Sequence, residues 1–197
     1  MATGLLIILS APSGCGKTTL VDRLLKRHPN WARSISVTTR TPREGEKDKA
    51  HYFFVTPEKF YDMESKGELL ESAKVFNYYY GTPNAFVMDH LKQGQNVVLA
   101  IDVQGMKKIK KLADIHLPLV TIFVLPPSIK ILRERLEGRS TESPEEVEHR
   151  IEIAQDEIKE AGFYDFTVMN QNLDQTVSEI EAVIEKSNKK TKKGDKQ

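Results

Sequence analysis

The fold of this chain is decided by residues 5–19, which read LLIILSAPSGCGKTT. The apolar run from Leu5 to Leu9 suits a strand that is buried on both faces of a parallel sheet. Small residues then predict a turn, and the stretch from Lys17 to His28, closed by Pro29, predicts a helix. A buried strand, a small-residue turn and a helix in this order are typical of a loop that holds phosphate groups.

The turn follows Walker A spacing, except that Ala11 stands where the first glycine is usual. Its backbone N–H groups are predicted to point at the phosphates of ATP. Lys17 is predicted to reach the β- and γ-phosphates, and Thr18 to place its hydroxyl on Mg²⁺ bound with ATP. The alternative is a turn that only joins a strand to a helix. The predicted ATP-binding residues here are Ala11, Pro12, Ser13, Gly14, Cys15, Gly16, Lys17, Thr18 and Thr19.

Composition sets limits on the class of protein. The chain has 197 residues with 39% apolar and 29% charged, enough for one sizeable core with small inserted lobes. A net charge of +1 argues against a surface that binds duplex nucleic acid. No apolar run is long enough to span a membrane, and no export signal is expected. Oligomeric state stays open.

The single cysteine, Cys15, excludes an intrachain disulfide and a cysteine-based zinc site, which fits a reducing, cytoplasmic compartment. Because Cys15 lies beside Lys17 and a helix start, a lowered thiol pKa with sensitivity to oxidation is a minor hypothesis. From Lys186 onward, six lysines face only Asp195. We expect a flexible, solubilising end there, and an arm for nucleic acid or an anionic surface is the alternative.

The pattern of strand followed by helix recurs along the chain. The predicted strands are 96–101 and 119–125, and the predicted helices are 106–112 and 128–136. Alternation of this kind predicts an α/β fold with a parallel sheet covered by helices. Residues 36–84 break the rhythm and predict an inserted lobe rich in β-structure. A polar loop at 138–143 then precedes a helix from Pro144, with Ser143 as its cap and Glu146 three residues on.

A second anion site is predicted by Arg40 and Arg43, three residues apart and near tyrosines, which suit the phosphate of a nucleoside monophosphate. Two solvated loop arginines are the alternative. The chain contains no Asn-Lys-x-Asp run of the kind that reads guanine in GTPases, so that class is excluded.

These motifs together resemble the guanylate kinases, from about Leu6 to Ile184. The resemblance rests on four motifs that occur in the family's order: the phosphate loop, the arginine pair, Tyr79-Tyr80-Gly81-Thr82 and Asp102-Val103-Gln104-Gly105. It implies transfer of phosphate from MgATP to GMP, and to dGMP, in purine nucleotide metabolism. The implied fold has a core (1–35, 85–137 and 146–185), a GMP-binding lobe (36–84), a lid (138–145) and a basic tail (186–197).

The resemblance also assigns individual residues. The implied GMP-binding residues are Ser36, Arg40, Arg43, Tyr52, Glu71, Tyr80, Thr82 and Asp102. Carboxylates and hydroxyls among them match the donors and acceptor of guanine, which disfavours AMP or a pyrimidine. The implied catalytic residues are Lys17, Arg40, Arg135, Arg139 and Arg150, whose charges face the transferred phosphoryl group. Asn170 matches a position near the adenine of ATP.

One departure concerns magnesium. The family usually has an acid where Ala100 stands, two residues before Asp102, so we expect Mg²⁺ to depend more on Thr18 and the nucleotide phosphates. The main alternative to an enzyme is an inactive guanylate-kinase-like module that binds other proteins. An intact Lys17, Thr18 and arginine pair favours the enzyme.

Overall fold

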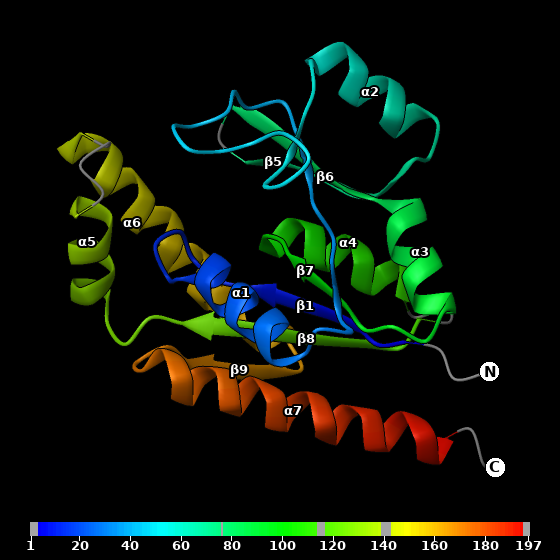
Figure 1. Cartoon of the computed structure of the whole chain (residues 1–197). Coiled ribbons are helices and arrows are strands. Elements are labelled where there is room, and N and C mark those ends of the chain that lie inside the picture. The colour runs from blue at the N-terminus through cyan, green and yellow to red at the C-terminus, as the bar shows by residue number, and fades with distance from the viewer. Residues whose placement is uncertain (1–3, 76, 114–116, 139–142, 195–197) are drawn as a thin grey trace. The chain divides into compact units, whose positions relative to one another are not determined.

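The structure is a computed structural model and describes residues 4–75, 77–113, 117–138 and 143–194. Figure 1 follows the chain from blue at the N-terminus to red at the C-terminus. Its contacts divide the chain into two compact units. The first unit holds Met1–Leu6, Asn30–Leu99 and Gln104–Leu119, and the second holds Ile7–Pro29, Ala100–Val103 and Val120–Gln197.

The main sheet has the parallel layout that the sequence predicts. Its strands are β1 (Leu6–Ser10), β2 (Ala32–Arg33), β7 (Val97–Ala100), β8 (Leu119–Leu125) and β9 (Phe166–Met169). They follow the order β2-β7-β1-β8-β9, and the pairs β2–β7 and β8–β9 are parallel. Parallel neighbours need crossover connections, which helices supply here. The predicted α/β class is confirmed.

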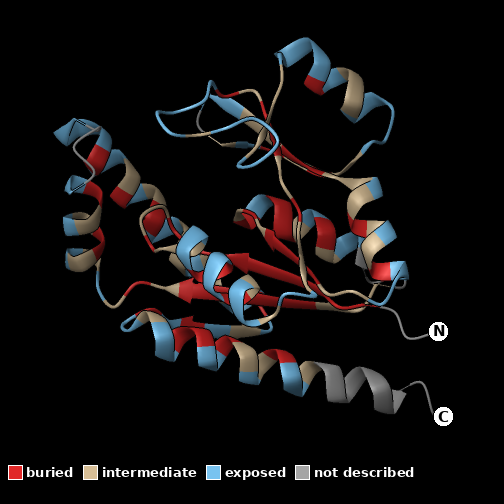
Figure 2. Cartoon of the chain, viewed as in Figure 1, coloured by how far each residue is buried: buried red, intermediate tan, exposed pale blue. Residues whose placement is uncertain are grey.

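Continuous apolar runs become buried strands. All of β1 is buried, and so is the middle of β8, where Figure 2 shows both strands in red. A strand without alternation of polar and apolar side chains can be satisfied only when both of its faces are covered. The last residue of β1, Ser10, is buried as well, so the loop that follows it starts at the edge of the apolar core.

Some helices of the second unit begin at a capping side chain. The helices of this unit are α1 (Lys17–Arg27), α5 (Ile129–Glu137), α6 (Pro144–Lys159), the short 3₁₀ helix η1 (Glu160–Phe163) and α7 (Leu173–Gly194). The predicted capping box of α6 is confirmed: the Ser143 hydroxyl accepts from the Glu146 N–H, and the Glu146 carboxylate accepts from the Ser143 N–H.

The C-terminal helix α7 packs its apolar face on the second unit. Val177, Ile180 and Ile184 recur at spacings of three and four residues and are fully or almost fully buried. Figure 2 shows the buried segments of α7 on the side that faces β9. The helix continues to Gly194, so part of the lysine-rich end is helical, and the flexible tail expected from residue 186 stays a prediction.

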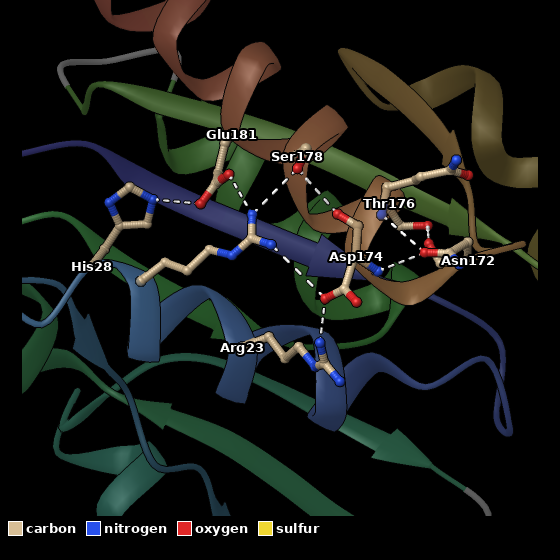
Figure 3. A network of polar contacts seen from close by, with 9 residues as sticks. Arg23, His28, Asn172, Asp174, Thr176, Ser178 and Glu181 are labelled. Atoms are coloured by element: carbon tan, nitrogen blue, oxygen red, sulfur yellow. Dashed lines mark hydrogen bonds and ion pairs between the residues drawn. The ribbon is translucent and has the colours of Figure 1, made fainter.

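Polar contacts fasten α7 to α1 (Figure 3). Arg27 Nη1 lies 3.0 Å from Glu181 Oε2, and His28 Nε2 lies 2.9 Å from Glu181 Oε1. Arg27 also donates to the Ser178 hydroxyl at 3.3 Å, and Arg23 pairs with Asp174. Because these side chains are partly exposed, each contact contributes little to stability.

The first unit contains a second sheet. Its strands are β3 (Val37–Thr38), β4 (Phe53–Phe54), β5 (Leu69–Val75) and β6 (Tyr78–Pro83), in the order β4-β3-β6-β5. Antiparallel β5 and β6 set Glu71 opposite Thr82 and Ala73 opposite Tyr80. Since alternate residues of a strand share a face, Tyr80 and Thr82 lie on one face of β6.

Helices of the first unit were only partly predicted. They are α2 (Pro57–Ser65), α3 (Asn84–Lys92) and α4 (Val103–Ala113), which starts at the boundary between the units. The expectation of a mostly β lobe overlooked α2, although Thr56 caps it and Pro57 occupies its first position. The division into core, GMP-binding lobe and lid stays a prediction, and 139–142 of the lid fall outside the described residues. Among the described residues no helix has the length and apolar character needed to cross a membrane.

Candidate active site

The loop between β1 and α1 has a backbone suited to anions. Gly14 and Gly16 adopt left-handed φ angles of 88° and 81°. A Cβ on Gly14 would come within 3.0–3.2 Å of the Leu132 and Leu136 side chains, so glycine is required for both conformation and space. Left-handed residues in a turn let backbone N–H groups converge on a concave side that binds anions, and the first amides of α1 add to it.

Lys17 begins α1 and is enclosed by polar groups of the second unit. Its ammonium donates to the Ile101 carbonyl at 3.5 Å. Burial lowers the pKa of Lys17, while the carboxylates of Glu157 and Asp102 oppose that effect. The charges that favour the protonated form of Lys17 are therefore the carboxylates of Glu157 and Asp102.

Glu157, on α6, is the carboxylate in this group that the sequence analysis did not single out. Burial raises its pKa to about 7, although the charge of Lys17 acts in the opposite direction and Asp102 adds to the rise. Arg150, Ala154 and Glu157 share one face of α6 at spacings of four and three residues. The Arg150 guanidinium donates to the Ser13 hydroxyl at 3.0 Å. One face of α6 thus contacts Ser13 through Arg150 and acts electrostatically on Lys17 through Glu157.

The other predicted arginines differ in position. Arg135, on α5, extends its guanidinium toward the Asn170 carbonyl at 3.5 Å and acts electrostatically on Cys15. Arg133 is a neighbour with a different role, because it bridges α5 to Glu148 on α6 with an Nη2–Oε1 distance of 2.8 Å. Arg139 lies outside the described residues.

Cys15 is fully buried within the loop. Burial raises its pKa to about 12, outweighing the opposing charges of Arg135 and Lys17. The hypothesis of a lowered thiol pKa is therefore wrong, because the cost of burying the thiolate exceeds the effect of the nearby positive charges. Its backbone carbonyl accepts a 2.7 Å hydrogen bond from the Asn170 amide.

The predicted monophosphate clamp lies in the first unit. Arg40 is only 8% exposed, and its guanidinium lies 5.5 Å from the centre of the Tyr52 ring. Tyr52 and Tyr80 meet edge to face at 6.0 Å. Burial lowers the pKa of Arg40, but hydrogen bonds to Glu46 and Tyr80 outweigh it and raise the pKa. The structure thus brings these three predicted residues together.

Glu46 is the second residue that sequence reasoning missed. The Arg40 Nη2 donates to both of its oxygens, at 2.8 and 2.9 Å, and the Arg43 backbone N–H donates to Oε2 at 2.7 Å. These donors keep the pKa of Glu46 below its usual value despite partial burial, which raises it. An acid three residues after Arg43 in a loop was the available signal.

The predicted base-recognition residues lie partly together. The Thr82 hydroxyl donates to Glu71 Oε1 at 2.7 Å, and both residues are buried. Ser36 directly precedes β3 and is half-buried. Asp102 belongs to the second unit, where it acts on Lys17 and Glu157. Its assignment to guanine stays a prediction.

Comparison with known proteins identifies the family. The guanylate kinase family model matches residues 3–187. A guanylate kinase from Rickettsia typhi is 47% identical, covering 92% of this chain and 90% of its own length, and one from Clostridioides difficile is 45% identical, covering 92% and 87%. The chain belongs to the guanylate kinase family. The resemblance found in the sequence is thereby confirmed.

A solved structure agrees with this guanylate kinase assignment. The guanylate kinase of Anaplasma phagocytophilum superposes with a TM-score of 0.76 at 32% identity, covering 94% of this chain and 86% of that one. The family is thus established, while the role of each predicted site residue stays a prediction.

Proposed function

We propose that this chain transfers the γ-phosphoryl group of ATP to GMP, giving ADP and GDP. The observation that carries the proposal is the shared face of β6, where Tyr80 of the phosphate clamp and Thr82 of the base pocket are two residues apart. A nucleotide whose phosphate lies against Arg40 and Tyr80 would then place its base toward Glu71 and Thr82.

Recognition of guanine follows from the Glu71–Thr82 pair. Guanine presents an N1–H and a 2-amino group as neighbouring donors, which a carboxylate can accept together. The Thr82 hydroxyl donates to one Glu71 oxygen at 2.7 Å, which orients the Glu71 carboxylate. Adenine has no N1–H or 2-amino group, and a buried carboxylate without its donors costs binding free energy.

The phosphate loop would hold ATP. Lys17, Arg135 and Arg150 all lie near this loop and would neutralise charge on the transferred group, as phosphoryl transfer requires. Thr18 is exposed at the start of α1, so its hydroxyl fits as a protein oxygen for Mg²⁺. Mg²⁺ held there would offset the negative charge of the ATP phosphates.

Magnesium use and location complete the proposal. Ala100 ends β7 without a carboxylate, so we expect Ala100→Asp to lower the Mg²⁺ concentration that gives half-maximal rate. If the rate depends on Mg²⁺ concentration in the same way in Ala100→Asp and in wild type, this expectation is rejected. The free thiol of Cys15 supports a cytoplasmic setting.

An assay that couples ADP release to NADH oxidation tests the proposal. Wild-type protein with MgATP should turn over GMP, and dGMP, at least a hundredfold more efficiently than AMP, UMP or CMP. Equal turnover of AMP would reject the role of Glu71 and Thr82. Lack of turnover with every acceptor, alongside retained GMP binding, would instead support the inactive binding module.

A further inference from the structure

Asn170 is held by both ends of its side-chain amide. It follows β9 and is 5% exposed. Its Nδ2 donates to the Cys15 carbonyl at 2.7 Å, and its Oδ1 lies 3.3 Å from the Thr176 hydroxyl, as one of three oxygens within reach of that single O–H donor. A carbonyl can only accept, so the Cys15 contact fixes the nitrogen end toward the loop.

The Asn170 backbone is fixed as well. Its N–H donates to the Leu125 carbonyl at 2.8 Å, at the end of β8. Thr176 lies in the first turn of α7, and its hydroxyl is also 2.8 Å from the Asn172 carbonyl and 3.1 Å from the Met169 carbonyl, which hold it beside Asn170. Together these contacts restrict the orientation that the Asn170 side chain can adopt toward the loop.

The peptide bond between Cys15 and Gly16 links the Asn170 hydrogen bond to the direction of a loop N–H group. In a trans peptide the C=O and the N–H point in opposite directions. Binding the Cys15 carbonyl to Asn170 therefore directs the Gly16 N–H away from Asn170. A Cβ on Gly16 would lie 3.1 Å from the Asn170 Nδ2, so the amide also packs directly beneath this left-handed glycine.

We propose that Asn170 is a positioning residue of the phosphate-binding loop, which it orients through the Cys15 carbonyl while Thr176 fixes Asn170 in turn. The resemblance to the family had suggested an adenine contact for this residue. The two assignments differ in which part of ATP they affect: a loop-positioning residue acts on the phosphates, whereas an adenine contact acts on the base. The inference rests on the proposed ATP-binding role of the loop.

The test separates phosphate from base. Steady-state assays would give the KM of ATP, the KM of GMP and the inhibition constant of inorganic tripolyphosphate, which competes with ATP and has no base. Asn170→Asp keeps the shape and removes the donor that faces Cys15. We expect the KM of ATP and the tripolyphosphate constant to rise together, by about tenfold, with the KM of GMP unchanged within twofold.

Thr176→Val provides the second variant, in case Asn170→Asp fails to fold. It removes the hydroxyl that orients Asn170, and both constants should rise by about threefold. Thr121→Val is the matched control, because Thr121 is equally buried in the same unit but bonds to Asp165 rather than to the loop. Both of its constants should stay within twofold of wild type.

Two results would overturn the proposal. A rise in the KM of ATP with an unchanged tripolyphosphate constant would place Asn170 at the base. A lower melting temperature with unchanged constants would make its role merely structural. Failure of the proposed function looks different, because wild-type protein itself would then not turn over GMP.

Discussion

At the residue scale, the group formed by Lys17, Glu157 and Asp102 predicts a pH dependence of stability. Burial raises the pKa of Glu157 from 4.5 to about 7, so between these values the folded chain holds a proton that the unfolded chain releases. The resulting stabilisation is fully present below pH 4.5 and is lost as the pH rises through 7.

Glu157→Gln should remove this pH dependence, because glutamine does not titrate. We expect wild-type protein to lose roughly 1–3 kcal/mol of unfolding free energy relative to the variant between pH 5 and pH 8. Urea denaturation at a series of pH values measures the difference. Parallel curves for the two proteins would show that Glu157 does not titrate in this range.

The Glu71 carboxylate carries a prediction about specificity. Glu71→Gln keeps the size of the side chain but replaces an acceptor with an amide donor beside the guanine donors. The KM of GMP should rise by about tenfold or more, with a smaller change in kcat. Glu68→Gln, an exposed neighbour, is the control and should match wild type. A normal KM for GMP in Glu71→Gln would show that Glu71 does not recognise the guanine base.

Residues with a recognisable motif were predictable from sequence, and residues without one were not. Lys17 and the arginine pair stand in fixed spacings that phosphate binding imposes. Glu46 and Glu157 are acids on a loop and on a helix, where most acids are solvated. Their roles depend on which groups the fold brings near them, and the burial of Cys15 likewise depends on the path of the loop rather than on its spacing.

At the scale of elements, the attachment of α7 allows apolar packing to be compared with ion pairs. Ile180 is fully buried, whereas Glu181 pairs with Arg27 and His28 at a partly exposed surface. Ile180→Ala should cost about 2–4 kcal/mol of unfolding free energy, because it leaves a cavity. Glu181→Gln should cost less than about 1 kcal/mol.

Thermal and urea unfolding of both α7 variants would check this order. An equal or larger loss for Glu181→Gln would mean that the polar network in Figure 3, rather than the apolar face, holds α7 in place. Assays with ATP and GMP on the folded fraction would show whether α7 affects the loop through Thr176, as the Asn170 inference requires.

Elements with strong local signals were predicted well. The strand at Leu119–Leu125 and the capped start of α6 match the sequence predictions. Short strands such as β2 and β3 were missed, because two residues carry no periodicity and form only where a neighbouring strand supplies hydrogen bonds. The helix at the C-terminal lysines was missed because composition alone suggested a solvated end.

At the scale of the whole molecule, each compact unit holds the residues of one of the two predicted nucleotide sites. The phosphate loop with Lys17, Arg135, Arg150 and Asn170 belongs to the second unit. The predicted phosphate clamp at Arg40 and the predicted base-recognition residue Glu71 belong to the first. The sequence predicted both sites by motif. Transfer of phosphate from one to the other requires that Lys17 act on the group being transferred, more than on the binding of either substrate alone.

A single-turnover experiment with γ-labelled ATP tests that claim most directly. Wild-type protein mixed with labelled ATP and GMP should move the label into GDP, with little released as inorganic phosphate. Lys17→Ala should slow this transfer by at least a thousandfold while binding GMP within a fewfold of wild type. Label that reaches GDP at a near-normal rate in Lys17→Ala, or that leaves wild-type protein mainly as inorganic phosphate, would contradict the account.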